Sequence, residues 1–355
     1  MPVEFRKDGD QLVWVRNPFT RAITYFTHVH LKRSGFIRRA QEAALRPAPP
    51  DSVAAEAERR AELERARRDC AFCPGNEHLT MEEVCRLSPS QVFGAHAAAS
   101  HTRGDWLIRA FYNIVPRLPE CCTGGRNESY VVVEDPRHFA DDARGHEDIL
   151  YTAMLPPEQF RALIEAAIVV ARRAYRNPAV NAVLVRKNQG RDSGASQPHL
   201  HCQVIGSDLP FAAVELEAAA LAGEPGLWDE IIRFMDGEGF VLERRDGWVS
   251  YFCPFGIFPR SYEIVLPSYR GRVVDLPAAQ LHTLADLLQA ILSSLGPLSL
   301  DYEIHDGLGV PVHAHVNARH YPYSNIGGTI NLPSTLLGPT SIAERRRPAA
   351  GPSSS

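Results

Sequence analysis

Apolar positions along this chain repeat with two different periods. Residues 156–178 and 277–296 carry apolar side chains at helical spacing, and the first of these runs ends before Pro178. Short runs rich in valine, isoleucine and aromatic residues predict strands at 11–18, 21–31, 106–118, 128–136, 179–190, 199–206, 239–256, 260–267, 299–307 and 312–322. Asp246-Gly247 predicts a hairpin turn inside residues 239–256. The pattern therefore predicts a protein of mixed helices and strands.

The order of these elements occurs twice. Each half shows strands, a helix, a strand and then a His-x-His strand, which indicates an internal duplication. We therefore expect one domain over residues 1–206 and a second over 207–340, with a disordered tail at 341–355. Residues 53–68 are rich in alanine, glutamate and arginine and predict a surface helix that leads to Cys70.

Composition narrows the class of protein. The 355 residues carry a formal net charge of −4, which argues against nucleic acid as a partner. The N-terminus has no apolar signal-peptide core, and no apolar run reaches membrane-spanning length, so we expect a cytoplasmic protein without a membrane partner. Seven cysteines in a chain this long do not indicate a disulfide scaffold; in a reducing compartment a close pair indicates a metal or redox site.

Cys70 and Cys73 form such a pair, with C-x2-C spacing followed by Pro-Gly. Two thiolates at this spacing can bind one zinc ion, although a redox pair or a chance spacing gives the same pattern. No second C-x2-C occurs in the chain, so histidines would supply the remaining ligands. The candidates are His138 and one of His199 and His201.

The most informative stretch is "NQGRDSGASQPHLHCQVIG", residues 188–206. In a strand, His199, His201 and Gln203 share one face, and three polar side chains on one face of an apolar strand need a ligand or a partner. The loop before them, residues 190–196, contains two glycines and two serines and can bring backbone N–H groups to a phosphate. The histidines are candidates for metal ligands, a phosphate-attacking nucleophile or ordinary strand residues.

A second row of histidines lies near the C-terminus. His313 and His315 share a strand face, and His305 precedes His313 by eight residues. This row predicts either a second metal site completed by a carboxylate or a polar wall of a cleft. No Walker motif, no GxSxG motif and no strong dinucleotide-binding fingerprint occurs.

Taken together, "CAFCPGNE", "IRAFYNIVPRL", "KNQGRDSGASQPHLHCQV" and "VHAHV" resemble, in this order, the galactose-1-phosphate uridylyltransferase family of the histidine-triad superfamily. The resemblance covers roughly residues 5–320, although Leu200 replaces the usual proline and residues 317–340 depart from the family pattern. It implies an α+β fold of two histidine-triad-like halves, with antiparallel sheets joined into a half-barrel and helices packed on them. It also implies a homodimer.

The resemblance implies a role for individual residues. His201 matches the nucleophile that accepts a nucleoside monophosphate, and Gln203 replaces the third histidine of related hydrolases, which favours transfer over hydrolysis. His199 matches the fourth ligand of a structural zinc. The other implied residues are the zinc ligands Cys70, Cys73 and His138, the substrate-binding residues Asn113, Asn188, Gly194, Ala195 and Ser196, and the ligands of a second divalent metal, Glu217, His305, His313 and His315.

The implied reaction is ping-pong transfer of a nucleoside monophosphate between a nucleotide sugar and a sugar 1-phosphate, by way of a nucleotidyl-histidine. An alternative is a phosphorylase of ADP-sugars or dinucleoside polyphosphates that uses inorganic phosphate as the acceptor. An alternative of another class is a zinc-stabilised nucleotide-binding protein without catalysis.

Overall fold

The computed structural model describes residues 3–9, 11–21, 23–25, 53–94, 105–141, 143, 149–256, 258 and 260–319. The expected disordered tail at 341–355, residues 320–340 and residues 26–31 of the strand expected at 21–31 lie outside the described residues. The chain divides into two compact units. We call Pro47–Pro210 with Leu276–Gln289 the central unit, and Met1–Arg46, Phe211–Asp275 and Ala290–Ser355 the terminal unit.

These units divide the chain differently from the expected domains 1–206 and 207–340, because the first 46 residues group with the later part of the chain. Contacts of the first strands explain this grouping. The Lys7 ammonium lies 2.6 Å from the Glu238 carboxylate, and the Asn17 amide donates to the Phe255 carbonyl at 3.2 Å. The Phe5 ring also packs against Phe234 at 5.0 Å between centroids.

The central unit is built on an antiparallel sheet with strand order β4-β5-β6-β8-β7. Its strands are β4 (Glu83–Leu87), β5 (Ile108–Tyr112), β6 (Ser129–Val133), β7 (Ala182–Gln189) and β8 (His201–Ser207). β7 alternates between buried and half-buried positions, whereas β6 and β8 are buried throughout. The sheet therefore holds the expected catalytic strand β8 between two neighbours.

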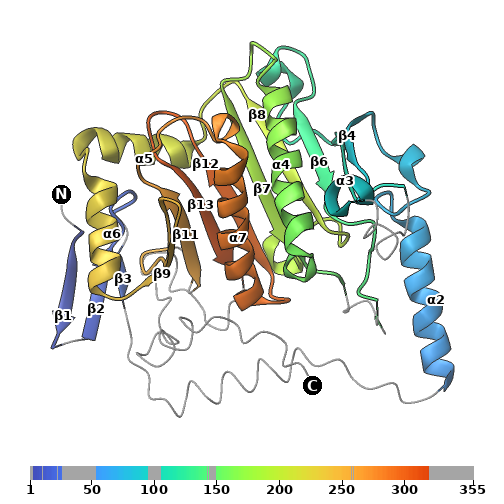
Figure 1. Ribbon diagram of the computed structural model, residues 1–355, viewed down its shortest axis with the longest axis horizontal. Helices are drawn as coiled ribbons and strands as arrows, with labels where there is room; N and C mark the ends of the chain where they lie inside the picture. Colours follow the sequence, from blue (N-terminus) through green and yellow to red (C-terminus); the bar gives the residue numbers. More distant parts are fainter. Residues whose placement is uncertain are drawn as a thin grey trace. The chain divides into compact units, whose positions relative to one another are not determined.

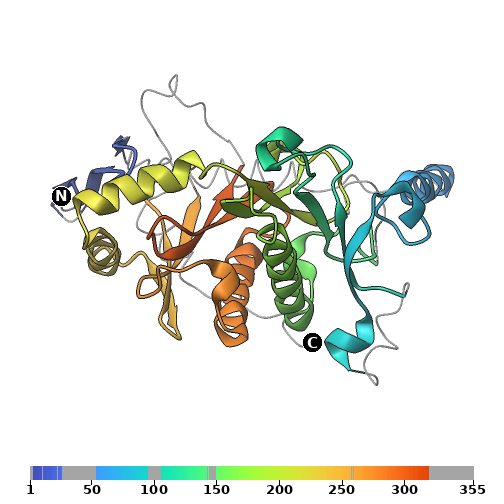
Figure 2. The same cartoon turned by 90° about the horizontal axis from the view of Figure 1, so that it is seen from above.

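One face of this sheet is covered by α4 (Pro157–Ala174), as Figures 1 and 2 show. The helix begins after Pro156 and buries a stripe that includes Phe160, Ile164 and Ile168. Proline is well tolerated in the first turn of a helix, because the backbone N–H groups of that turn have no carbonyl partner within the helix. Every second residue of these strands buries an apolar side chain beneath this helix. The residues between them point to the opposite face of the sheet, and they include His201 and Gln203.

A buried ion pair lies on the helix-covered side of β7. The Lys187 ammonium is 2.5 Å from a Glu134 carboxylate oxygen, and both side chains are almost fully buried. Lys187 also donates to the backbone carbonyl of His201 at 3.2 Å, and the Thr152 hydroxyl donates to Glu134 at 2.8 Å. The pair therefore joins β7 to the first residue of the expected catalytic strand.

We predict that Lys187→Ala lowers the free energy of unfolding by about 3–5 kcal/mol, because it leaves the Glu134 carboxylate buried without a cation. Chemical denaturation measures the change. The double variant Lys187→Met/Glu134→Gln is the control and should lose less stability than Lys187→Ala, since no buried charge remains. Equal stability of Lys187→Ala and the parent protein would contradict this role.

The terminal unit contains five antiparallel sheet strands of order β12-β13-β11-β10-β9 and a three-stranded antiparallel sheet of order β1-β2-β3. Their strands are β1 (Phe5–Asp8), β2 (Gln11–Arg16), β3 (Ile23–Tyr25), β9 (Val241–Arg245), β10 (Trp248–Phe252), β11 (Ser261–Leu266), β12 (Leu300–His305) and β13 (Val312–Ala318). β9 and β10 form the expected hairpin. Asp246 and Gly247 both have positive φ angles, 50° and 88°, which an Asp-Gly turn accommodates.

The remaining helices are α2 (Val53–Asp69), α3 (Pro89–Phe93), α5 (Ala212–Gly223), α6 (Leu227–Gly237) and α7 (Ala278–Leu295). Short 3-10 turns lie at η1 (Glu77–Leu79), η3 (Glu120–Thr123), η4 (Thr152–Met154), η5 (Arg191–Ser193) and η6 (Val273–Asp275). α7 lies beside α4, joined by Arg161 to Asp286 at 2.7 Å and by His282 to Glu165 at 2.7 Å (Figure 2). Among the helices of the described residues, none combines the length and apolar character needed to cross a bilayer.

The observed architecture confirms the expected α+β class with antiparallel sheets and packed helices. The surface helix expected at 53–68 is α2, whose described side chains are mostly exposed or half-buried and which ends one residue before Cys70. β1, β4, α3, α5 and α6 were not expected from the hydrophobic pattern. α5 is evenly apolar and shows no amphipathic stripe, so its sequence gives little periodic signal.

Candidate functional site

Four ligand-type side chains expected to bind one metal come together in the central unit. Their donor atoms all lie within 4.8 Å of one another, and the four residues are buried: Cys70, Cys73, His138 and His199. Cys70 follows α2 and Cys73 lies on the next turn, His138 follows β6, and His199 precedes β8. Segments more than 120 residues apart in the sequence thus converge on one point.

The distances between these donor atoms suit a tetrahedral metal ion. The Cys70 sulfur lies 3.6 Å and the Cys73 sulfur 3.5 Å from His199 Nδ1. The Cys73 sulfur also lies 3.4 Å from His138 Nδ1. Sulfur and nitrogen ligands of one tetrahedral zinc lie about 3.5–3.6 Å apart, given Zn–S near 2.3 Å and Zn–N near 2.0 Å. Two sulfurs and two nitrogens are also the donor set of structural zinc sites, so the cluster is compatible with zinc.

Neighbouring backbone groups hold these ligands in place. His199 Nε2 lies 2.7 Å from the Asp135 carbonyl, which can only accept, so Nε2 carries the proton and Nδ1 faces the cysteines. The Asn76 amide donates to the Cys70 carbonyl at 2.8 Å and to the end of α2. The contact with Cys73, together with those to His138 and His199, lowers the pKa of the Cys70 thiol. These contacts favour a thiolate in the cluster.

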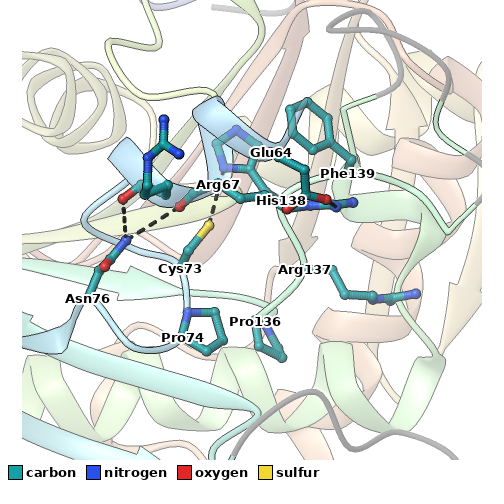
Figure 3. Close-up of a pocket in the computed structure, with 10 residues that line it drawn as sticks. Glu64, Arg67, Cys73, Pro74, Asn76, Pro136, Arg137, His138 and Phe139 are labelled. Carbon is teal, nitrogen blue, oxygen red and sulfur yellow. Dashed lines mark hydrogen bonds and ion pairs between the residues drawn. The ribbon is translucent and has the colours of Figure 1, made fainter. Parts of the chain in front are cut away.

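A cavity of about 400 Å³ lies beside this cluster, and Figure 3 shows the residues that line it. Cys73 and His138 form one wall, and Arg67, Arg137 and Glu64 reach in from α2 and from the segment after β6. Its arginines already have carboxylate partners: Arg67 lies 2.8 Å from Glu64, Arg137 lies 2.9 Å from Asp135, and Arg68 lies 3.6 Å from Asp69. The positive charges of Arg67 and Arg137 in this cavity are therefore already balanced by carboxylates.

His201, the expected nucleophile, is the first residue of β8 and only 7% exposed. Its Nδ1 lies 2.8 Å from the His199 carbonyl. Because a carbonyl only accepts, Nδ1 carries the proton and Nε2 keeps a free electron pair. Burial lowers the pKa of His201 to about 4. The ring is therefore neutral at pH 7, in the form that can attack an electrophile.

The face that His201 shares with Gln203 has an apolar wall on one side and polar groups on the other. In register, His201 lies opposite Val133 and Gln203 lies opposite Val131, both on β6. These valines pack with Phe111 and Trp106, and Phe72 from the Cys-x-x-Cys turn completes the wall. The Phe72 ring meets His201 edge-on at 5.3 Å between centroids. One ring thus links the cysteine turn to the expected nucleophile.

The glycine-rich loop of residues 190–196 lies directly before this face. Gly194 has a φ of +79°, a conformation that favours glycine over any residue with a Cβ. Gly194 and Ser196 are exposed and Ala195 is half-buried. The Ser193 hydroxyl instead turns inward and donates to the Gln189 carbonyl at 2.7 Å. The loop therefore presents Gly194, Ala195 and Ser196 outward, where a ligand can reach them.

Two expected substrate-binding asparagines are already engaged in the fold. The Asn188 amide oxygen accepts from Arg186, and its amide nitrogen donates to the Ser193 carbonyl. Asn113 follows β5, two strands away from β8, and its side-chain oxygen accepts from the Val115 backbone at 3.2 Å. Asn188 therefore joins the loop to β7, whereas Asn113 follows a strand that is separated from β8 by β6.

The second expected metal cluster comes together in the terminal unit. Donor atoms of four residues from α5, β12 and β13 lie within 4.8 Å of one another: Glu217, His305, His313 and His315. The Glu217 carboxylate lies 3.1 Å from His305, 3.3 Å from His313 and 3.3 Å from His315. Burial opposes ionisation of Glu217, but the histidines outweigh it and hold the pKa of this carboxyl well below its ordinary range.

Three residues of these sites were not found from the sequence. Glu263 lies 3.3 Å from His315 Nδ1, on the side of the ring away from Glu217. Arg186 lies opposite Gln203 in register and faces the same way. The strand alternation of residues 182–189 gives a signal for Arg186, since it places Arg186 and Asn188 on one face. Phe72 has no comparable signal beyond its place between the two cysteines.

Comparison with known proteins agrees with this picture. Over 151 residues the chain is 26% identical to a probable galactose-1-phosphate uridylyltransferase of Drosophila melanogaster, a match that covers 39% of this chain and 43% of that protein. The chain thus spans less than half the length of the curated relative it matches. This match confirms the resemblance to the uridylyltransferase family.

Solved structures share the fold at low sequence identity. An ADP-glucose phosphorylase from Arabidopsis thaliana, with bound ADP-glucose, superposes with a TM-score of 0.58 at 18% identity, covering 94% of this chain and 98% of that one. A galactose-1-phosphate-uridylyltransferase-like protein from the same plant gives a TM-score of 0.57 at 18% identity, covering 79% and 92%.

The family model described as "Domain of unknown function (DUF4921)" matches residues 120–303, which is more than half of the 355 residues. This stretch contains His138, the glycine-rich loop, His199, His201 and Gln203. The match therefore includes the expected nucleophile and two of the four residues of the Cys/His cluster. The chain belongs to the DUF4921 family.

Proposed function

We propose that this protein is a nucleotidylyltransferase that moves a nucleoside monophosphate between a nucleotide sugar and a sugar 1-phosphate. The observation that carries the proposal is the state of His201. Its ring is buried and neutral, with Nδ1–H on the His199 carbonyl and Nε2 free, and it shares a sheet face with Gln203. A neutral imidazole held in one tautomer is suited to attack phosphorus.

The reaction has two steps. His201 Nε2 attacks the α-phosphorus of the nucleotide sugar, a P–N bond forms, and the P–O bond to the sugar 1-phosphate breaks with its electron pair on the departing oxygen. A phosphate oxygen of the second sugar 1-phosphate then attacks the nucleotidyl-histidine. The new P–O bond forms as the P–N bond breaks, and the electron pair returns to Nε2, so His201 is regenerated.

Gln203 acts on the transferred phosphoryl group. Its amide can donate a hydrogen bond to the phosphoryl oxygens, where negative charge accumulates in the transition state. The amide cannot exchange a proton at neutral pH and so cannot activate a water molecule, which favours transfer to a second phosphate over hydrolysis. The exposed Gly194 and Ser196 of the glycine-rich loop can bring further backbone N–H donors to the phosphoryl group.

The two clusters support metal binding with different donor sets. Cys70, Cys73, His138 and His199 would hold zinc, and Glu217, His305, His313 and His315 would hold a second divalent metal. With four protein ligands the zinc would supply rigidity and no open position for substrate. His199 connects the zinc cluster to the proposed nucleophile, because its backbone carbonyl accepts a hydrogen bond from the His201 ring.

A second candidate is a phosphorylase of ADP-sugars or dinucleoside polyphosphates. The superposition on the ADP-glucose phosphorylase covers nearly the whole of both chains and favours it. Its first step would be the same, and inorganic phosphate would replace the sugar 1-phosphate as acceptor. A homodimer and a cytoplasmic location remain predictions.

The test uses nucleotide sugars labelled at the α-phosphate, with uracil, adenine and guanine bases. We expect an acid-labile, base-stable label on the protein, which is lost when the correct acceptor is added. Sugar 1-phosphates and inorganic phosphate, added separately, distinguish the two candidate reactions. His282→Ala, a change of a half-buried histidine of α7 that bonds to Glu165, is the matched control and should label normally. Recovery of every ligand unchanged, without label, would favour a non-catalytic nucleotide-binding protein and overturn the proposal.

We predict that Gln203→His raises the fraction of nucleotidyl-enzyme lost to water, roughly tenfold or more relative to transfer, because the imidazole adds an acid-base group beside the phosphoryl group. The ratio of free nucleoside monophosphate to transfer product measures this. Gln203→Asn keeps an amide and serves as the control; it should slow both paths without changing their ratio. An unchanged ratio in Gln203→His would show that Gln203 does not decide between transfer and hydrolysis.

A further inference from the structure

We propose that Arg186 is a further catalytic residue, whose guanidinium binds the phosphate group that leaves in the first step and attacks in the second. This inference rests on the proposed function and extends it, since it assigns to the chain a subsite for a phosphate monoester beside His201. It follows from the position of Arg186, from its bonding partners and from the charge that the reaction develops.

The position of Arg186 is set by strand pairing. Arg186 on β7 lies directly opposite Gln203 on β8. Directly opposite residues in an antiparallel pair point to the same face, with Cβ atoms about 5 Å apart. Arg186 therefore points to the face of His201 and Gln203, and its neighbour Lys187 points to the helix-covered face, where it meets Glu134.

The bonding of Arg186 leaves its charge uncompensated. The side chain is half-buried, and its guanidinium donates to the neutral amide oxygen of Asn188. Across the residues that the structure describes, no carboxylate lies within ion-pairing distance of it, whereas Arg109 and Arg137 of the same unit each have one. A half-buried guanidinium with five donors and no anion is suited to receive an anionic ligand.

Asn188 is the residue that holds Arg186 in this position. Its oxygen accepts from Arg186 and its nitrogen donates to Ser193 in the glycine-rich loop, so both polar atoms of the side chain have partners inside the protein. The expected contact of Asn188 with the phosphates is therefore better assigned to Arg186. Asn188 becomes the positioning residue that ties the arginine to the loop.

The reaction needs a positive charge at this point. When the P–O bond to the sugar 1-phosphate breaks, negative charge grows on the departing phosphate, and the Gln203 amide on the same face carries no charge to balance it. The planar fork of a guanidinium can donate two parallel hydrogen bonds to a phosphate. The same contact would orient the incoming phosphate of the acceptor, because the second step passes through the same subsite in reverse.

The experiment measures the rate of His201 labelling in a single turnover for Arg186→Gln, Arg186→Lys and the control Arg176→Gln. Arg176 is exposed and lies just beyond the end of α4, which covers the opposite face of the sheet. With a nucleotide sugar we expect a loss of roughly 10²–10³-fold in Arg186→Gln. Arg186→Lys should recover part of it, since an ammonium keeps the charge but not the fork. Arg176→Gln should react at the parent rate.

A second substrate separates catalysis from folding. The 4-nitrophenyl ester of the same nucleoside monophosphate has a good leaving group that carries no phosphate. With this ester Arg186→Gln should label His201 within roughly fivefold of the parent protein, because no departing phosphate needs the guanidinium. An equal loss with both substrates would mean that Arg186 is structural, and no loss with the nucleotide sugar would overturn the subsite. Failure of the parent protein to label with either substrate would instead defeat the proposed function itself.

Discussion

His201→Ala should lower nucleotidyl transfer by roughly 10⁴–10⁶-fold, the range seen when a covalent nucleophile is removed from an enzyme. Nε2 is the atom that forms the bond to phosphorus, and alanine offers no other nucleophile. The two sulfurs and two nitrogens of the Cys/His cluster remain, since His201 is not among them. The substitution should therefore slow the first chemical step and leave the metal content of the protein unchanged.

Two measurements check this prediction. Single-turnover labelling with the correct nucleotide sugar should show no nucleotidyl-protein, and metal analysis should show the same zinc content as the parent protein. His282→Ala is the control for the loss of a histidine side chain without a role at this site. Transfer at more than about one hundredth of the parent rate in His201→Ala would exclude His201 as the nucleophile.

Cys73→Ser should abolish zinc binding and lower the melting temperature by roughly 10–15 °C. A serine hydroxyl is not a zinc ligand of this kind, and a structural zinc site contributes folding free energy directly. A loss of about 3–5 kcal/mol in a unit of this size corresponds to such a shift. Cys73 contacts both His138 and His199, so its loss also releases the segment after β6 and the start of β8.

Metal content and thermal unfolding test this prediction without any assay of activity. The control is Cys121→Ser, which changes an exposed cysteine outside both clusters and should leave zinc content and melting temperature unchanged. A strong chelator should shift the parent protein toward the melting temperature of Cys73→Ser. If Cys73→Ser bound one zinc with undiminished stability, the cluster would not be a zinc site.

Periodic elements could be predicted from the sequence because their signal is local. The helix expected at 156–178 is α4, Pro157–Ala174, and the strand expected at 199–206 is β8, His201–Ser207. α3 also has a local signal in the sequence, at its first turn. Ser88 and Gln91 form a capping box, in which each side chain bonds to the backbone of the other residue.

Contacts between distant segments could not be predicted in this way. The Lys187–Glu134 pair joins residues 53 positions apart, and no pattern along the chain links them. Glu263 meets His315 because β11 and β13 pair in a register that only the folded sheet sets. Glu217 was found through family resemblance, since α5 itself shows no helical periodicity.

The anchor of the His201 ring is a main-chain carbonyl two residues earlier, just before β8, and His313 repeats this arrangement with the Pro311 carbonyl just before β13, at 2.7 Å. A substitution elsewhere in the chain cannot delete a carbonyl, so no neighbouring side chain is needed to fix the tautomer. The backbone therefore determines which nitrogen of His201 attacks. Side chains around the site can diverge to accept another base or sugar while the nucleophile keeps the same form.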